Sequence, residues 1–226
     1  VMSRSPDKSY ARALLASAHI RAQKGAQALE LLEPMIKEGS KDPNVYALAG
    51  EASVLVQDIK AAEKYFAQAA KLAPNDPAQK SRLALARIGS GEADQAIADL
   101  EAAVKMDSPG QYSDILLIMT YLRQKQFDKA LAAIDALEKK QPNNVLAHNL
   151  RATAYLGKRD APTARAALEK GLAMKPDSIS LVQNLSRIDL LENKPQVAVS
   201  RLEAFNKKFP NDSQGVLALA QLKEQL

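Results

Sequence analysis

The feature that most constrains this chain is an internal period of 34 residues. Alanine recurs at six positions in this phase, and a large apolar residue follows each alanine four residues later. A series dominated by proline keeps the same phase from Pro6 to Pro210, and a series of small residues keeps it from Ala16 to Ala220. Because no insertion shifts the phase, we expect supersecondary modules that stack on their neighbours. The recurrent alanines are Ala28, Ala62, Ala96, Ala130, Ala164 and Ala198.

Each module is predicted to contain two helices. In residues 77–110, a first helix runs from 77 to about 88, Gly89-Ser90-Gly91 breaks it, and a second helix runs from 93 to about 106. Pro109 then prevents the second helix from continuing. The recurrent alanine lies where the two helices are expected to cross, because only a small side chain fits between close backbones.

Composition supports an all-α protein. Hydrophobic residues make up 46% of the 226 residues and aromatic residues only 4%, while the helix formers Ala, Leu, Lys, Glu and Gln are abundant. The absence of cysteine excludes disulfides and thiolate metal sites. The net charge of +5 is spread along the chain, so we expect an ordinary solvated surface.

The repeat resembles the tetratricopeptide repeat (TPR). The fifth repeat is typical, with Ala152, Tyr155, Ala164, Leu168 and Pro176 at the expected offsets. The resemblance implies a right-handed α-solenoid of antiparallel helix-turn-helix units. Residues 1–8 would end a truncated preceding repeat, and residues 213–226 would form a capping or truncated helix. The six full repeats between them would span 9–42, 43–76, 77–110, 111–144, 145–178 and 179–212.

One repeat position departs from the family. TPR units often carry an aromatic residue at their fourth position, where this chain is variable. Here the fourth positions are Arg12, Tyr46, Lys80, Asp114, His148, Val182 and Val216.

The later repeats also resemble a narrower family, the TPR lipoproteins of the PEP-CTERM/exosortase system. Residues 127–143, 148–152 and 184–195 carry this resemblance. It implies a role in bacterial exopolysaccharide assembly or export, or in PEP-CTERM protein sorting. It also implies a periplasmic array attached to the outer membrane through a lipid-bearing cysteine upstream of residue 1, and no other membrane contact.

Nothing in the sequence predicts catalysis. His19 and His148 are the only histidines, and each lies where the family packs an aromatic residue. Gly89-Ser90-Gly91 lacks the lysine and the preceding strand of a phosphate-binding loop. We find no metal-ligand spacing, no nucleophile–base arrangement and no nucleic-acid footprint. The chain is therefore expected to be a non-catalytic scaffold without a cofactor.

The resemblance implies that first helices line a concave groove that holds a protein or peptide. The lining would come from the second, fifth, ninth, twelfth and thirteenth positions of each repeat. Residues 115–119 are apolar on every side, so their helix is either buried or presents an apolar patch. The predicted groove residues are Leu85, Tyr112, Ile115, Met119, Leu122, Arg123, Asn149, Thr153, Gln183 and Arg187.

Two alternatives remain open at this level. A neighbouring helix, a dimer partner or strong curvature could cover the apolar patch. The basic chain could also bind an anionic polysaccharide or a membrane surface directly. Salt separates this second alternative from groove binding, because screening weakens charge attraction and leaves apolar contacts intact.

Overall fold

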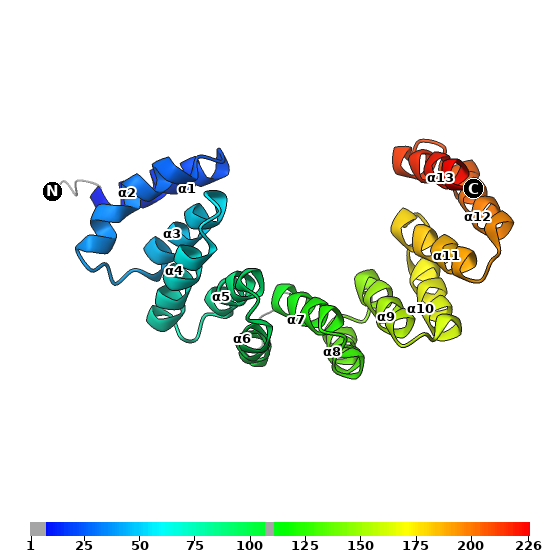
Figure 1. The fold of residues 1–226 in the computed structure, drawn as a ribbon, viewed down its shortest axis with the longest axis horizontal. Helices are drawn as coiled ribbons and strands as arrows, with labels where there is room; N and C mark the ends of the chain where they lie inside the picture. Colours follow the sequence, from blue (N-terminus) through cyan, green and yellow to red (C-terminus); the bar gives the residue numbers. More distant parts are fainter. Residues whose placement is uncertain (1–7, 107–110) are drawn as a thin grey trace, which may run out of the picture. The chain divides into compact units, whose positions relative to one another are not determined.

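The computed structural model describes residues 8–106 and 111–226, and all regular structure in these ranges is helical. Consecutive helices form helix-turn-helix pairs that pack in chain order, as expected for a TPR solenoid (Figure 1). The all-α fold class predicted from the sequence is therefore confirmed. The helices are α1 (Lys8–Arg21), α2 (Gly25–Lys37), α3 (Pro43–Leu55), α4 (Ile59–Leu72), α5 (Pro77–Ser90), α6 (Ala93–Lys105), α7 (Tyr112–Arg123), α8 (Phe127–Lys140), α9 (Val145–Gly157), α10 (Ala161–Met174), α11 (Ile179–Leu191), α12 (Pro195–Lys208) and α13 (Ser213–Gln225).

The chain divides into two compact units, residues 1–120 and residues 121–226. We call them the N-terminal unit and the C-terminal unit. The N-terminal unit contains α1 to α6 and most of α7, and the C-terminal unit contains α8 to α13. Pro6, which begins the proline series, and Pro109, which was predicted to stop a second helix, lie outside the described residues.

The six recurrent alanines have no exposed surface at all. The large apolar residue four positions after each alanine is at most 4% exposed. This pair forms the centre of each repeat, because the alanine lets the helices approach and the larger residue fills the space one turn later. Burial of apolar surface between successive helices therefore stabilises the array.

The turn between the two helices of a repeat differs from the prediction. Gly89 and Ser90 remain helical, and only Gly91 ends α5, with a φ of 86°. The fifteenth position of each other full repeat also has a positive φ, although none of those residues is glycine. The tight turn thus imposes a left-handed residue that most side chains adopt only under strain. These residues are Gln23, Gln57, Lys125, Arg159 and Asn193.

An ion-pair clamp joins neighbouring repeats of the N-terminal unit. Arg87, at the eleventh position of the third repeat, lies 3.5 Å from Glu63 on α4 and 2.6 Å from Asp99 on α6. The arginine thus connects one repeat to the next across α5.

The C-terminal unit contains the same clamp with its charges inverted. Asp189, at the eleventh position of the sixth repeat, is 1% exposed and lies 2.8 Å from both Arg165 on α10 and Arg201 on α12. The three residues occupy the same repeat positions as the three in the other clamp. Burial raises the pKa of Asp189, but the hydrogen bonds from Arg201 and Arg165 outweigh this and hold that pKa below its ordinary value.

Candidate binding groove

A groove of about 740 Å³ lies on the first-helix side of the N-terminal unit. It runs chiefly between α3 and α5, and α1, α4 and α7 complete it. Most of its residues occupy the second, ninth, twelfth or thirteenth position of their repeat, as the family resemblance implied. The lining consists of Ile20, Gln23, Glu51, Val54, Leu55, Ile59, Phe66, Ala78, Arg82, Leu85, Ala86, Gly89 and Tyr112.

The floor of this groove is apolar and rigidly supported. Phe66 of α4 is 4% exposed and contributes its ring to the lining. The ring rests on Gly50 of α3, where a Cβ atom would lie 2.5 Å from Phe66 Cε1. Glycine at this point lets the ring sit against the helix backbone, which fixes the depth of the groove.

The walls of the groove expose apolar surface to solvent. Val54 of α3 is 45% exposed and Leu85 of α5 is 39% exposed. Exposed apolar side chains around a concave surface are typical of ligand and peptide sites, because the ligand covers them and releases water. The groove can therefore accept one or more large apolar side chains.

The charged groups on the rim neutralise each other. Arg82 Nε lies 3.1 Å from Glu51 Oε1, and both side chains are about one-third exposed. Such a pair contributes little stability, but it leaves the rim without a net charge. The apolar lining and the balanced rim of this groove favour an apolar ligand over a charged one.

Two of the predicted groove residues, Leu85 and Tyr112, line this groove together. Ile115 is half-buried and Met119 is 53% exposed, and neither belongs to the lining. Their helix is therefore neither fully buried nor wholly exposed, since Leu117 and Ile118 are buried. The groove extends from Leu85 toward α3 and α1, and the part toward Met119 stays a prediction.

The remaining predicted residues belong to the C-terminal unit. Leu122 is half-buried and Arg123 is exposed. Asn149 accepts a hydrogen bond from Asn184 Nδ2 at 2.6 Å, and Thr153 donates one to the Asn149 carbonyl at 3.1 Å. These two polar residues of α9 are thus engaged within their own unit.

Gln183 and Arg187 of α11 are exposed and line a separate depression of about 360 Å³ beside α13. This depression lies wholly in the C-terminal unit. A ligand role for these two residues remains a prediction.

Sequence reasoning missed Ile59 and Phe66, which belong to a second helix although the groove lies among first helices. A signal was present. Gly50, at the eighth position, marks a point where a side chain of the second helix must contact the backbone of the first helix. Residue spacing alone does not say that the side chain in contact also reaches the groove.

The histidine of the C-terminal unit packs inside its repeat. His148 is 3% exposed, and its Nε2 atom lies 3.1 Å from Met174 Sδ. Burial lowers the pKa of His148, even though Glu138 lies 3.5 Å from Nδ1 and opposes the shift. The ring is accordingly neutral at pH 7 and fills space between α9 and α10. His19 of α1 is half-buried.

Neither a metal-binding cluster nor a membrane-spanning helix occurs among the described residues. Within residues 8–106 and 111–226, no group of three or more His, Asp or Glu side chains is arranged to hold a metal ion. In the same ranges, no helix combines the length and the hydropathy required to cross a bilayer.

Paired helices, repeated at 34 residues and opening an apolar groove on one side, define a class of helical-repeat interaction scaffolds. Two tetratricopeptide repeat profiles match the chain, one over residues 43–76 and the other over residues 115–179. Residues 43–76 and 115–179 therefore carry tetratricopeptide repeats. A comparison with curated proteins finds no match.

Several solved TPR structures share the fold at low sequence identity. PilW, described as a type IV pilus biogenesis factor, is 16% identical, covers 96% of this chain and 99% of its own, and gives a TM-score of 0.72. MamA from Desulfovibrio magneticus RS-1 is 19% identical, covers 77% and 99%, and gives 0.62. YrrB, described as having an unusual peptide-binding site, is 18% identical, covers 75% and 88%, and gives 0.62.

Proposed function

We propose that this chain is a non-catalytic scaffold that holds an apolar segment of a partner protein in the groove of the N-terminal unit. The carrying observation is the groove itself, with an apolar floor at Phe66 and exposed apolar walls at Val54 and Leu85. A helix or an extended peptide with large apolar anchors fits such a groove. The peptide-binding site described for YrrB, a protein of similar fold, supports the proposal.

We further propose that the scaffold acts in bacterial exopolysaccharide assembly or export, or in PEP-CTERM protein sorting. The support is the sequence resemblance of residues 127–143, 148–152 and 184–195 to TPR lipoproteins of that system. The same resemblance supports a periplasmic location with attachment to the outer membrane.

The alternative function is direct binding of an anionic polysaccharide or membrane surface, which the net charge of +5 favours. The paired charges of Arg82 and Glu51 on the rim favour the peptide instead, because they leave no free cation there. Ionic strength separates the two functions. Binding to an anionic polymer collapses between about 0.05 and about 0.5 M salt, whereas apolar groove binding persists.

The test is selection from a phage-displayed library of random peptides about 16 residues long. We expect the chain to enrich peptides with large apolar anchors, and Leu85→Glu to reduce their affinity about tenfold or more. Leu14→Glu is the matched control, because Leu14 is 59% exposed and lies outside the groove lining. Peptides that bind both variants equally well would refute the groove as their site.

A further inference from the structure

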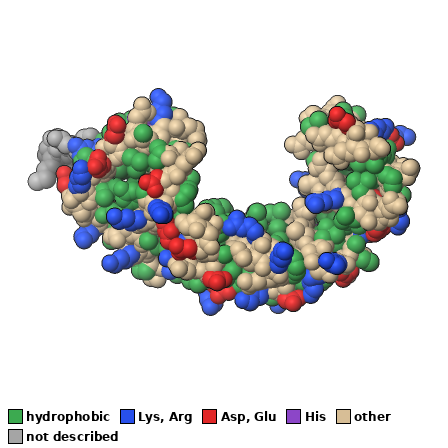
Figure 2. Space-filling model, in the orientation of Figure 1, with side chains coloured by type: hydrophobic (Ala, Val, Ile, Leu, Met, Phe, Trp, Pro, Cys, Tyr) green, Lys and Arg blue, Asp and Glu red, His purple; other side chains and the backbone are tan. Residues whose placement is uncertain are grey.

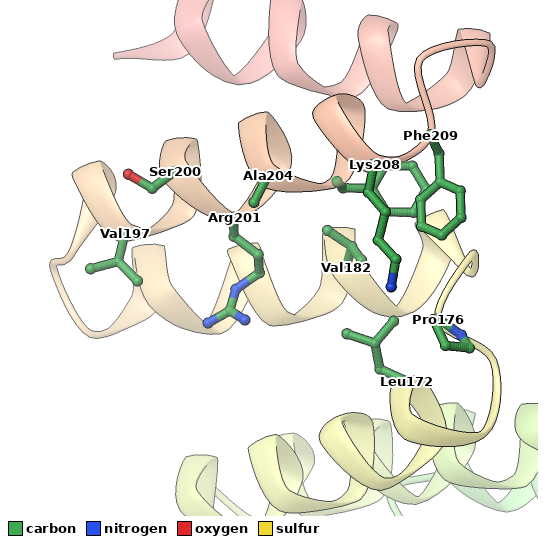
Figure 3. Close-up of a pocket in the computed structure, with 10 residues that line it drawn as sticks. Leu172, Pro176, Val182, Val197, Ser200, Arg201, Ala204, Lys208 and Phe209 are labelled. Atoms are coloured by element: carbon green, nitrogen blue, oxygen red, sulfur yellow. The ribbon is translucent and has the colours of Figure 1, made fainter.

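A second groove, of about 490 Å³, lies in the C-terminal unit on the side of the second helices. On the face shown in Figure 2, hydrophobic side chains gather over α10 to α12, with Lys and Arg side chains around them. The close-up in Figure 3 shows Leu172 and Pro176 facing Lys208 and Phe209 across the opening, with Arg201 pointing into the same region. This groove uses no residue of the N-terminal one.

The groove is open because of the residue at the fourth position of the sixth repeat. In the fifth repeat the fourth residue is His148, whose ring reaches Met174 at the thirtieth position. In the second repeat it is Tyr46, which is 7% exposed and belongs to an apolar cluster against which Leu72, at that same thirtieth position, packs. The sixth repeat has Val182, which is too short to fill this space.

The thirtieth residue of the sixth repeat is Lys208, which is exposed. Its ammonium lies 5.4 Å from the centre of the Phe209 ring, so its stem covers apolar surface while its charge stays at the rim. The sixth repeat thus differs from the second and fifth repeats at two positions. Val182 stands where they have a ring, and Lys208 stands where they have an apolar residue, which leaves an apolar hollow beside a cation.

The charge of this groove has one sign. Arg201 and Lys208 are the two charged side chains of its lining, and both are cations. Buried Asp189 holds Arg201 in place through Nε at 2.8 Å and Nη2 at 3.3 Å. Asp189 also pairs with Arg165, and Arg165 in turn pairs with Glu192 at 3.1 Å. The charge of Arg201 is therefore largely balanced, and the exposed ammonium of Lys208 supplies most of the positive charge of the lining. The rim therefore presents a fixed guanidinium and an exposed ammonium next to an apolar floor.

We call this second groove, between α10 and α12, the outer groove. We propose that the outer groove binds a segment of a partner protein in which a large apolar side chain is flanked by carboxylates. Charge complementarity selects this occupant, because carboxylates form charge-assisted hydrogen bonds with Arg and Lys at the rim. The apolar side chain fills the hollow above Val182 and beside Phe205. Binding here is sensitive to salt, in contrast to binding in the neutral groove of the N-terminal unit.

The experiment uses the same displayed peptide library on the full chain and on Val182→Tyr. Tyrosine is the residue that occupies the fourth position in the second repeat, so this variant fills the groove with a side chain that the fold already uses. We expect acidic peptides with an apolar anchor to be enriched on the wild-type chain and their affinity to fall about tenfold or more on Val182→Tyr. Enrichment that is unchanged on Val182→Tyr, or that lacks acidic residues, overturns the proposal.

Lys208→Glu provides a second variant on the exposed rim, where a change of side chain leaves the core intact. We expect it to weaken the recovered acidic peptides severalfold and to flatten their salt dependence between about 0.05 and about 0.5 M. Helicity measured by circular dichroism should match the wild-type chain for both variants. An affinity for the acidic peptides that is equal on Lys208→Glu and the wild-type chain contradicts the assigned rim.

Leu85→Glu separates this groove from the N-terminal one. Acidic peptides should bind it as they bind the wild-type chain, so a failure of either groove is visible independently of the other. Vesicles of phosphatidylglycerol and the polysaccharide alginate serve as further probes. Suppose that the wild-type chain binds the vesicles or alginate, that Val182→Tyr does not, and that no acidic peptides are enriched. The occupant of the groove would then be a lipid or a polysaccharide, and the proposed protein partner would be wrong.

Discussion

Replacing the buried carboxylate of Asp189 with an amide is expected to destabilise the C-terminal unit. Asp189→Asn removes the negative charge between Arg165 and Arg201, which are 22% and 24% exposed. Breaking a fully buried ion pair costs about 3–5 kcal/mol. Because both arginines can partly rehydrate, we expect about 2–3 kcal/mol here. For a chain of this length that corresponds to a fall of about 5–10 °C in melting temperature.

The assay is thermal unfolding followed by circular dichroism at pH 7. Asp135→Asn is the matched control, since Asp135 also pairs with an arginine, Arg151 at 2.6 Å, but is 59% exposed. An exposed pair of this kind contributes less than about 1 kcal/mol. If Asp189→Asn lowers the melting temperature no more than Asp135→Asn does, the buried clamp contributes no more to the free energy of unfolding than an exposed ion pair, and the reasoning is refuted.

Three further outcomes follow from the same structure. The difference in melting temperature between the wild-type chain and Asp189→Asn should hold at neutral pH and narrow below about pH 4. The reason is that the lowered pKa of Asp189 contributes stability that is lost as the pH falls through that pKa. A difference in melting temperature that widens in acid would contradict the lowered pKa. Ala96→Leu should cost about 1–3 kcal/mol by overpacking the helix crossing, measured by urea unfolding, and an unchanged midpoint counts against close packing there. Gly50→Ala should displace the Phe66 ring and lower the affinity of the groove for its peptides, although alanine favours the helix by about 1 kcal/mol. Equal affinity of Gly50→Ala and the wild-type chain for a recovered apolar peptide would show that the Phe66 ring does not fix the depth of the groove.

Much of the fold could be predicted from the sequence, because the same pattern of small and large apolar residues recurs in six repeats. The buried alanines and their apolar partners identify the helix pairs without reference to any single propensity. Ala96 and Leu100 illustrate this, since both are fully buried at the predicted crossing. A periodic apolar pattern is a direct consequence of how stacked helices bury surface.

The turn residues could not be predicted in the same way. Gln57 and Lys125 adopt a positive φ that their side chains do not favour. The short connection between two well-packed helices imposes this geometry, so tertiary packing overrides local preference. Among the turn residues, Gly91 and Asn193 are of types that favour a positive φ, whereas the other four are not.

The grooves were partly predictable. Leu85 and Tyr112 were predicted as lining residues because the resemblance to the tetratricopeptide repeat implies that the ninth and second positions of a repeat line a groove. The outer groove was not, because it depends on what Val182 lacks relative to Tyr46 and His148. A missing ring at one position creates a hollow only if the side chain opposite does not fill it, and that requires the packed structure.

The most direct test of the scaffold function is a methyl NMR titration of the full chain with an apolar peptide recovered by selection. We expect the methyl signals of Val54, Ile59 and Leu85 to shift together and saturate at one peptide concentration, while the Leu14 signal stays in place. Shifts spread evenly over the chain, or none at the three groove residues, would contradict it.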